Sequence, residues 1–355
     1  MTFWNRILNP VSLDIGMDLG TANTLVYVKG RGIILDEPSV VAIDQKTGKP
    51  IKVGEEAKIM LGRTPESIEA VRPLKEGVIA DFRASKMMIS YFLAKVQQRR
   101  GFIARTRMVI GVPSGITQVE EQIVRETAEK AGTGFQTEVR LVPEPLAAAV
   151  GAGLPVLEPT GNMIVDIGGG TTEVAVISIG RIVSCESLSI AGDNLNDSII
   201  QYLRKQHSLM VGERTAEEVK MQIGSAWHES DQGSMSIRGI HVNTGLPSAM
   251  DISAAEIREA MQEPLKGILD GILRTLEKAP PELAADIMDR GIVLTGGGAV
   301  LKGLDRLISV TAQVPVHIAE NPMLCVAQGC GRVLEEIARP QESNWATLLG
   351  FKHLP

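Results

Sequence analysis

The sequence predicts an α/β protein made of two related halves, each with an inserted segment. One pattern occurs twice, at residues 15–28 and 164–177: an apolar strand ending in Asp, a turn of Gly and Thr, and a second apolar strand. Two such loops suit the two sides of a polyphosphate, so a nucleotide is expected in the cleft between the halves. Short β-type stretches also alternate with helical ones, with Gly and Pro between them. The 355 residues are enough for two domains, each with its own core.

Composition excludes several classes of protein. A hydrophobic content of 44% with 22% charged residues is typical of a globular chain. The net charge of −6 argues against broad nucleic-acid binding, so no nucleic-acid partner is expected. Three cysteines (Cys185, Cys325 and Cys330) suit a reducing cytoplasm better than a disulfide framework or a zinc site. No apolar run reaches the roughly 18 residues of a membrane span, and no secretory signal is expected.

The two hairpins are the predicted phosphate-binding elements. Strands are expected over residues 15–18 and 25–28 in the first hairpin, and over residues 164–166 and 174–177 in the second. Gly in each turn permits positive φ and close backbone approach, so turn N–H groups can point at phosphate oxygens. The Thr hydroxyls add further donors. The alternative is two ordinary hairpins that carry Asp in their turns.

The two strand-ending aspartates, Asp18 and Asp166, indicate a metal ion. If the hairpin ends converge, two carboxylates about 4 Å apart repel by roughly 4 kcal/mol at an effective dielectric near 20. A divalent cation removes this conflict, and Mg²⁺ usually keeps several waters beside one or two carboxylates and the phosphates. We therefore expect Mg²⁺ near both aspartates, bound through water.

The remaining elements follow in chain order. The first half is expected to contain a strand over 32–36, an inserted lobe over 38–72 (strand 39–43, turn 46–49, helix after Gly54), a helix over 85–99, a strand over 108–112, and helices over 117–131 and 146–151. The second half is expected to contain an insertion over 193–245 that is helical and then β-like, a helix over 253–277, a strand over 291–294, a turn over 295–298, and helices from about Val300 and over 325–338. The last helix could pack back onto the first half.

Several motifs carry a resemblance to a known family. They are DLGTANT (18–24), IEAVRPLKEGVIADF (68–82), EPLAAAVGAG (144–153), DIGGGTTEVAV (166–176), GERTAE (212–217) and LTGGG (294–298). In this order and spacing, the chain resembles the MreB family of bacterial actins, within the superfamily of actin, heat-shock chaperone and hexokinase ATPases. The resemblance covers nearly the whole chain.

The resemblance implies an actin-like ATPase fold of four subdomains. Their boundaries would be 11–36, 77–149 and 322–345 for subdomain IA, 37–76 for IB, 150–187 and 253–321 for IIA, and 188–252 for IIB, after a membrane-binding segment over 1–10. It also implies ATP with Mg²⁺, and filaments of the protein itself at the inner face of the cytoplasmic membrane. The expected further partners are membrane proteins of the cell-wall synthesis and shape complex. The protein would be cytoplasmic and peripheral to the membrane.

The resemblance also assigns nucleotide-binding residues. The phosphate loops would contain Asp18, Gly20, Thr21, Ala22 and Asn23 in the first hairpin and Asp166, Gly168, Gly169, Gly170 and Thr171 in the second. Glu217 and Lys220 would face the ribose and adenine, and Gly296, Gly297 and Gly298 would line the adenosine side. The alternative for Glu217 and Lys220 is that they are exposed helix residues.

Glu144 is the candidate catalytic residue, with Thr171 helping to hold the attacking water. Hydrolysis of ATP needs an oriented water in line with the phosphate, and a carboxylate can orient or deprotonate it. Glu144 lies between Pro143 and Pro145, which stiffen its backbone. The alternative is an acid that only favours the dipole of a helix N-terminus. Pro143 departs from the family, where an acidic residue is common.

Two apolar segments are candidates for membrane contact. Phe3, Trp4, Ile7 and Leu8 would fall on one side of a short helix, and Phe102 and Ile103 lie between cations. The alternatives are a frayed terminus and a partly buried loop. One short helix binds lipid weakly, but an array along a polymer binds strongly, so membrane binding should depend on polymerisation.

Three other functions share features with this sequence. A sugar or acetate kinase would share both phosphate loops but needs a carboxylate base for a substrate hydroxyl, and no convincing candidate is present. A chaperone ATPase would need a peptide-binding domain after the nucleotide domain, and none is expected before Pro355. The third function is that of a different actin-like filament, such as a plasmid-segregating filament, a division-site tether or a close paralogue within the family.

Overall fold

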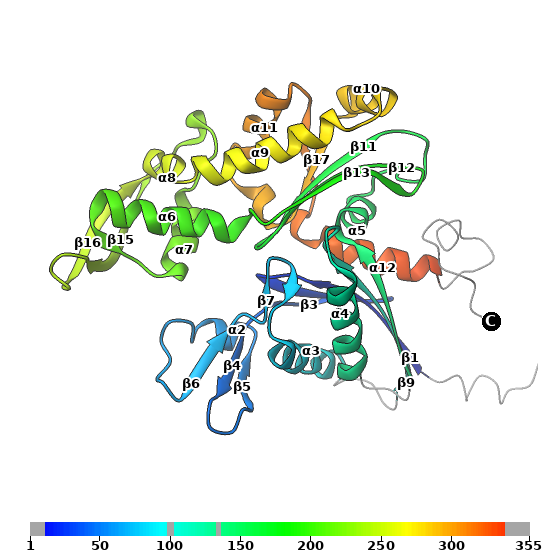
Figure 1. Cartoon of the computed structure of the whole chain (residues 1–355), viewed down its shortest axis with the longest axis horizontal. Helices are drawn as coiled ribbons and strands as arrows, with labels where there is room; N and C mark the ends of the chain where they lie inside the picture. Colours follow the sequence, from blue (N-terminus) through cyan, green and yellow to red (C-terminus); the bar gives the residue numbers. More distant parts are fainter. Residues whose placement is uncertain (1–10, 98–102, 133–135, 338–355) are drawn as a thin grey trace, which may run out of the picture. The chain divides into compact units, whose positions relative to one another are not determined.

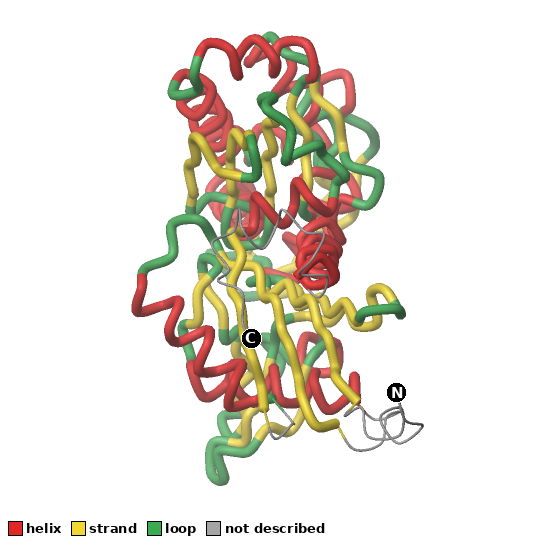
Figure 2. Tube along the Cα trace, turned by 90° about the vertical axis from the view of Figure 1, so that its right-hand side faces the viewer, coloured by secondary structure: helices red, strands yellow, loops and turns green. Residues whose placement is uncertain are grey.

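The computed structural model describes residues 11–97, 103–132 and 136–337, and the chain divides into two compact units (Figure 1). The first unit comprises residues 1–154 and 324–355, and the second comprises residues 155–323. Each unit combines strands and helices and contains a five-stranded sheet (Figure 2). Among the described residues, no helix has both the length and the apolar character needed to cross a bilayer.

The two five-stranded sheets have the same strand order. The first is β10-β9-β1-β2-β3, with β1 (Val11–Leu19), β2 (Asn23–Val28), β3 (Gly32–Pro38), β9 (Ile103–Val112) and β10 (Gln136–Pro143). The second is β13-β12-β11-β17-β18, with β11 (Asn162–Ile167), β12 (Thr172–Ser178), β13 (Arg181–Leu188), β17 (Ile292–Thr295) and β18 (Val316–Ile318). In each sheet the three strands that come first in the chain (β1–β3 and β11–β13) pair antiparallel with one another. The two later strands (β9 and β10, or β17 and β18) pair in parallel, beginning beside β1 or β11. The predicted pair of related α/β halves is therefore confirmed.

The remaining elements are helices and shorter strands, and these strands form small sheets of their own. In the first unit they are β4 (Val41–Asp44), β5 (Pro50–Val53), α2 (Glu55–Lys58), β6 (Ile68–Val71), β7 (Leu74–Lys75), β8 (Val78–Ile79), α3 (Phe82–Gln97), α4 (Gln118–Ala131), α5 (Glu144–Gly151) and α12 (Cys325–Ile337). In the second unit they are α6 (Gly192–His207), β14 (Leu209–Met210), α7 (Glu213–Ile223), β15 (Ser234–His241), β16 (Pro247–Ser253), α8 (Ala254–Ala260), α9 (Gln262–Glu277), α10 (Pro281–Arg290) and α11 (Leu304–Ala312). Short 3₁₀ turns cover His228–Ser230, Gly297–Val300 and Pro322–Leu324.

Strand β1 separates two helical layers in the first unit. Its apolar residues Leu13, Ile15 and Met17 are buried in one core with residues of α3 and α4, which lie side by side (Figure 1). The other face carries Gly16, where a Cβ atom would lie 2.5 Å from the backbone nitrogen of Gly331 in α12. Because side chains alternate along a strand, the same strand supplies a core face and a bare face on which a helix can rest.

Helices α5 and α12 touch through glycines. A Cβ atom on Gly329 would lie 1.8 Å from the carbonyl oxygen of Ala147, and one on Gly151 would lie 1.8 Å from that of Cys325. The guanidinium of Arg332 also donates to the carbonyl of Val150. The backbones of the two helices therefore meet without side chains between them, and this contact fixes the direction of α5.

Two predicted helix boundaries were wrong. The expected single helix over 253–277 is two helices, and Met261, with φ −89° and ψ −2°, is the end cap of the first and the start cap of the second. Pro264 has no N–H to donate back to Ala260, so an unbroken helix would lose a hydrogen bond and clash there. The helix expected from about Val300 begins at Leu304, because Gly303 has a left-handed φ of 72°.

Replacing Gly329 by Ala tests the helix contact. The added Cβ would meet backbone atoms, which cannot rotate away. We therefore expect the free energy of unfolding to fall by about 3 kcal/mol or more and the melting temperature by about 6 °C or more. Circular dichroism melting measures this shift. Gly212→Ala is the control, because Gly212 has a φ of −85° and no atom within 4 Å of an added Cβ. Equal melting midpoints for the two variants would contradict the proposed close contact.

Candidate functional site

The first hairpin loop, residues 20–23, is held by its carbonyl oxygens. The last pair between β1 and β2 is Leu19 with Thr24, so the loop begins directly after it. The Ser39 hydroxyl donates to the carbonyl of Gly20 at 2.6 Å, and the Ser39 N–H donates to the carbonyl of Ala22 at 2.9 Å. The N–H of Gly77 donates to Thr21 Oγ1 at 3.0 Å. Three contacts from outside the hairpin thus fix the predicted phosphate loop.

Asn23 has a contact of its own. Its side-chain amide donates to Asp36 Oδ1 on β3 at 2.7 Å. Asn23 is therefore engaged with the neighbouring strand, and it contributes to the site by fixing the end of the loop.

Asp18, Glu144 and Cys330 gather at the end of the first sheet. Asp18 of β1 is half-buried and lies opposite Gly111 of β9, while Glu144 is only 7% exposed. Cys330 of α12 is fully buried, and burial raises the pKa of its thiol, with smaller contributions from the negative charges of Asp18 and Glu144. The first unit therefore brings both predicted acidic residues to one place, beside a thiol that the sequence did not assign to it.

Glu144 begins α5, two residues earlier than the predicted helix start. Pro143 is the last residue of β10, with φ −56° and ψ 130°, and Pro145 stands in the first turn of the helix. Pro before and after Glu144 restricts the backbone on both sides, so the carboxylate has a defined direction. The expected placement of Glu144 at the start of a helix is confirmed, and the strand β10 that precedes it was not predicted.

The second hairpin loop, Gly168–Thr171, rests on the N-terminus of α6. The N–H of Gly168 donates to the carbonyl of Thr171 at 2.9 Å, which closes the turn. The carbonyls of Gly168 and Gly169 accept from the N–H groups of Gly192 and Asp193, at 3.1 and 2.8 Å. Thr171 is buried. A helix start thus orients the loop carbonyls, as Ser39 does in the first unit.

Lys220 approaches the base of the second loop. Its ammonium donates to the carbonyl of Gly192 at 2.7 Å, and Gly192 in turn bonds the loop. Glu217 lies one helical turn earlier on α7, and both side chains are half-buried. The alternative that these two are exposed helix residues is therefore wrong in its exposure, since both are half-buried, although both do lie on a helix.

Asp166 occupies an unfavourable position for a negative charge. It is 6% exposed near the end of β11 and accepts a 2.7 Å hydrogen bond from the hydroxyl of Thr295 on β17. The pKa of Asp166 is raised to about 6, mainly by burial and to a smaller extent by the charge of buried Glu173, against the lowering effect of the Thr295 hydrogen bond. A cation would favour the charged form, so the residue fits a role beside a divalent ion.

Gly296–Gly298 lie against the end of β11. A Cβ on Gly296, where φ is 79°, would lie 2.3 Å from the carbonyl oxygen of Ile167, and one on Gly298 would lie 2.3 Å from Cγ2 of Ile167. Gly297 is exposed, with no atom within 4 Å of an added Cβ. The second unit thus gathers Asp166, the loop 168–171, Lys220 and this glycine turn, and Gly297 leaves open space beside them.

Sequence reasoning missed the residues that support this site: Ser39, Cys330, Thr295 and Glu173. Thr295 lies inside the LTGGG motif and Glu173 inside the DIGGGTTEVAV motif, so their membership of these motifs was a usable signal. Ser39 and Cys330 lie far from the motifs in sequence, and the sequence contains no signal for them.

Other predicted sites have a simple outcome. Five of the six residues predicted to contact the membrane lie outside the described residues: Phe3, Trp4, Ile7, Leu8 and Phe102. The sixth, Ile103, is the first residue of β9, and only its backbone is described. In the described part of the chain, no group of three or more His, Cys, Asp or Glu residues is arranged to hold a metal ion.

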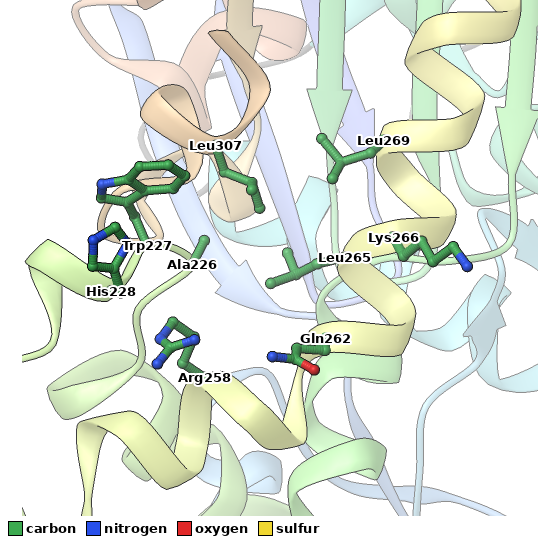
Figure 3. A pocket seen from close by; sticks show the side chains of 9 residues that line it. All are labelled: Ala226, Trp227, His228, Arg258, Gln262, Leu265, Lys266, Leu269 and Leu307. Carbon is green, nitrogen blue, oxygen red and sulfur yellow. The ribbon is translucent and has the colours of Figure 1, made fainter. Parts of the chain in front are cut away.

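A separate pocket of about 240 Å³ lies within the second unit (Figure 3). Its apolar side chains are Leu265, Leu269 and Leu307, which point into the space, with Trp227 at its edge. Polar groups from Arg258, Gln262 and His228 stand around it. None of the residues predicted for the nucleotide site lines this pocket.

Comparison with known proteins gives a consistent family. A family model described as MreB/Mbl protein matches residues 12–342. The chain is 50% identical to the cell shape-determining protein MreB of Escherichia coli K12, over 92% of this chain and 94% of that protein. It is 49% identical to the cell shape-determining protein Mbl of Bacillus cereus, over 92% of this chain and 97% of that protein.

Solved structures resemble the whole chain. The crystal structure of MreB5 of Spiroplasma citri bound to ADP has a TM-score of 0.87 and 36% identity, covering 94% of this chain and 99% of that one. The same protein bound to AMPPNP has a TM-score of 0.86. A MamK double helical filament has a TM-score of 0.76 at 22% identity, over 92% of this chain and 99% of that one, which is a likeness of fold alone. The predicted actin-like fold is confirmed.

The environment of Asp166 predicts how stability depends on pH. Because its pKa in the folded state (about 6) is above the ordinary value of 3.8, protonation favours the fold, and this contribution is lost as pH rises through 6. Without nucleotide or metal, Asp166→Asn should therefore be more stable than the natural protein near neutral pH, by up to about 3 kcal/mol. The difference should vanish below about pH 4.

Thermal melting across this pH range measures the effect. Asp251→Asn, on an exposed side chain, controls for the loss of one negative charge. Parallel pH curves for Asp166→Asn and the natural protein would contradict the assigned environment.

Proposed function

The chain belongs to the MreB/Mbl family, and we propose that it is a bacterial actin-like cell-shape protein that binds and hydrolyses ATP and forms filaments at the membrane. The observation that supports this most is the repeated hairpin. In each of two sheets of equal topology, a strand has Asp as its last residue but one and leads into a Gly/Thr loop whose carbonyls accept hydrogen bonds from neighbouring elements. A single ordinary hairpin would need no such repetition.

The nucleotide part of the proposal is that both hairpin loops contact the phosphate groups of one ATP. Residues 20–23 and 168–171 would bind phosphates, and Asp18 and Asp166 would hold Mg²⁺ through water. The MreB5 structures were obtained with ADP and AMPPNP, at 36% identity to this chain, which favours an adenine nucleotide. The raised pKa of Asp166 favours a cation beside it. Mg²⁺ would neutralise phosphate charge in the transition state.

The nucleoside part rests on α7 and the glycine turn. We place the ribose and adenine near Glu217, Lys220 and Gly296–Gly298. The ammonium of Lys220 bonds Gly192, whose N–H bonds the carbonyl of Gly168, so one hydrogen-bonded chain connects the nucleoside side with the phosphate loop. Gly297 leaves room for a flat group to approach the backbone.

Hydrolysis would be carried out by Glu144 with help from Thr171. Glu144 is buried at a helix N-terminus and restricted by Pro143 and Pro145, so it can direct an attacking water without moving. The Thr171 hydroxyl would hold the same water. Glu144 would accept the proton that the water loses, and the burial of its carboxylate keeps bulk water from competing.

The assembly part extends the family resemblance. We propose the division into subdomains IA, IB, IIA and IIB with the boundaries given above, and homopolymer filaments whose N-terminal residues contact the inner face of the cell membrane. The protein would be cytoplasmic and peripheral to the membrane, and its membrane partners would be proteins of cell-wall synthesis and the shape complex. The relatives are named for determining cell shape, which supports this placement.

Two substitutions separate binding from hydrolysis. Glu144→Ala should keep ATP affinity within about threefold but lower phosphate release by about 100-fold, because it removes only the group that directs the water. Asp18→Ala should instead weaken Mg²⁺-ATP binding by about tenfold or more. Phosphate release and fluorescent-nucleotide titration measure the two effects. Phosphate release at the natural rate by Glu144→Ala would remove this residue from the mechanism.

Membrane binding should depend on polymerisation. Sedimentation with vesicles that contain anionic lipid should show strong binding with ATP and Mg²⁺ and weak binding for the monomer, since contacts along a filament add up. Removing residues 1–9 and replacing Phe102 and Ile103 by Ser should abolish vesicle binding and leave filaments intact. Equal binding by monomer and filament would count against this part of the proposal.

A further inference from the structure

Gly111 is a glycine in the middle of a sheet with no conformational reason for it. It lies near the end of β9, opposite Asp18 on one side and Val142 of β10 on the other. Among the described glycines that have positive φ, Gly111 is absent, so its backbone could accommodate any residue. Gly inside a strand weakens it by roughly 0.5–1 kcal/mol, and its presence often indicates that another group approaches closely.

Three buried side chains fill the space that a residue at this position would need. A Cβ atom on Gly111 would lie 2.9 Å from Cγ1 of Val326, 3.3 Å from Cγ of Glu144 and 3.7 Å from Sγ of Cys330. Val326 is 5% exposed and Cys330 is fully buried. Both belong to α12, which is held against β1 at Gly16. Glu144 therefore packs over Gly111 of β9, beside Val326 and Cys330 of α12.

A second observation shows that the charge of Glu144 lies close to Cys330. The negative charges of Glu144 and Asp18 both raise the pKa of the Cys330 thiol, after the larger effect of its burial. The thiol thus lies within electrostatic reach of both carboxylates, which agrees with the distances to Gly111.

We propose that Gly111 is a positioning residue for hydrolysis, because its missing side chain provides the space in which Val326 and Cys330 hold Glu144 in its catalytic direction. The inference rests on the proposed role of Glu144. A methyl group at this position would push the Glu144 side chain away from the sheet by a few tenths of an ångström or more. A displacement of about 1 Å between a catalytic group and its reactant can lower a rate about 100-fold.

The test compares Gly111→Ala with the double variant Gly111→Ala, Val326→Ala. Gly111→Ala should lower kcat for phosphate release by about tenfold or more, with KM for ATP within about threefold of the natural value. The second substitution removes the closest clash but leaves the contact with Glu144. The double variant should therefore melt at the temperature of Val326→Ala alone, but its kcat should stay well below that of Val326→Ala, which is the reference because it removes one of the side chains that hold Glu144. A kcat that recovers together with the melting temperature would overturn the inference, since Gly111 would then be only structural.

Cys330→Ala removes one of the side chains that pack beside Glu144 and adds no atoms. It is therefore informative even if the Gly111 variants do not fold. The looser packing around Glu144 should lower kcat about threefold or more and leave KM unchanged. A kcat equal to that of the natural protein would overturn the inference. Glu144→Ala measured alongside distinguishes the two proposals. Full phosphate release by Glu144→Ala would reject the proposed mechanism itself. An inactive Glu144→Ala with natural kcat in the double variant would reject only the role of Gly111.

Discussion

Asp166 carries its carboxylate in a nearly closed environment at the end of a central strand, with a threonine hydroxyl as hydrogen-bond donor and a second carboxylate close by. Such a group costs folding free energy when it is charged, because burial removes the water that would solvate it. The hydrogen bond from Thr295 offsets part of this cost, and the strand that carries Asp166 leads into a loop whose carbonyls accept hydrogen bonds from the start of α6. A cation with its phosphate ligands would complete this environment.

Glycines determine how close the helices come to the sheet. In the first unit, Gly16 lets α12 rest on β1, and Gly151 and Gly329 let α5 meet α12 at backbone distance. The direction of α5 follows from these contacts, and α5 begins with Glu144. The position of one buried carboxylate thus depends on residues that have no side chain. This is why the apolar face of β1, with its large residues, and the bare face on its other side are equally necessary.

Much of this organisation was predictable from sequence, for physical reasons. Both hairpins and α4, α5 and α12 have strong local patterns: alternating or periodic apolar residues bounded by Gly, Thr or Pro. Strand β10 was missed because Glu138 and Arg140 interrupt its apolar pattern; Glu138 pairs with Arg105 of the neighbouring strand at 2.8 Å, a contact that only the fold creates. Strand β18 has three residues, too few for a pattern. The role suggested for Gly111 could not be seen in sequence, since what fills its space comes from α5 and α12.

The most direct test of the whole account is electron microscopy of the purified protein on a lipid monolayer, with ATP and Mg²⁺ together and with each omitted in turn. The account predicts lipid-bound filaments that require the nucleotide. Dispersed particles under every condition, from protein that still hydrolyses ATP, would contradict the filament function and indicate a soluble kinase or phosphatase of the same fold.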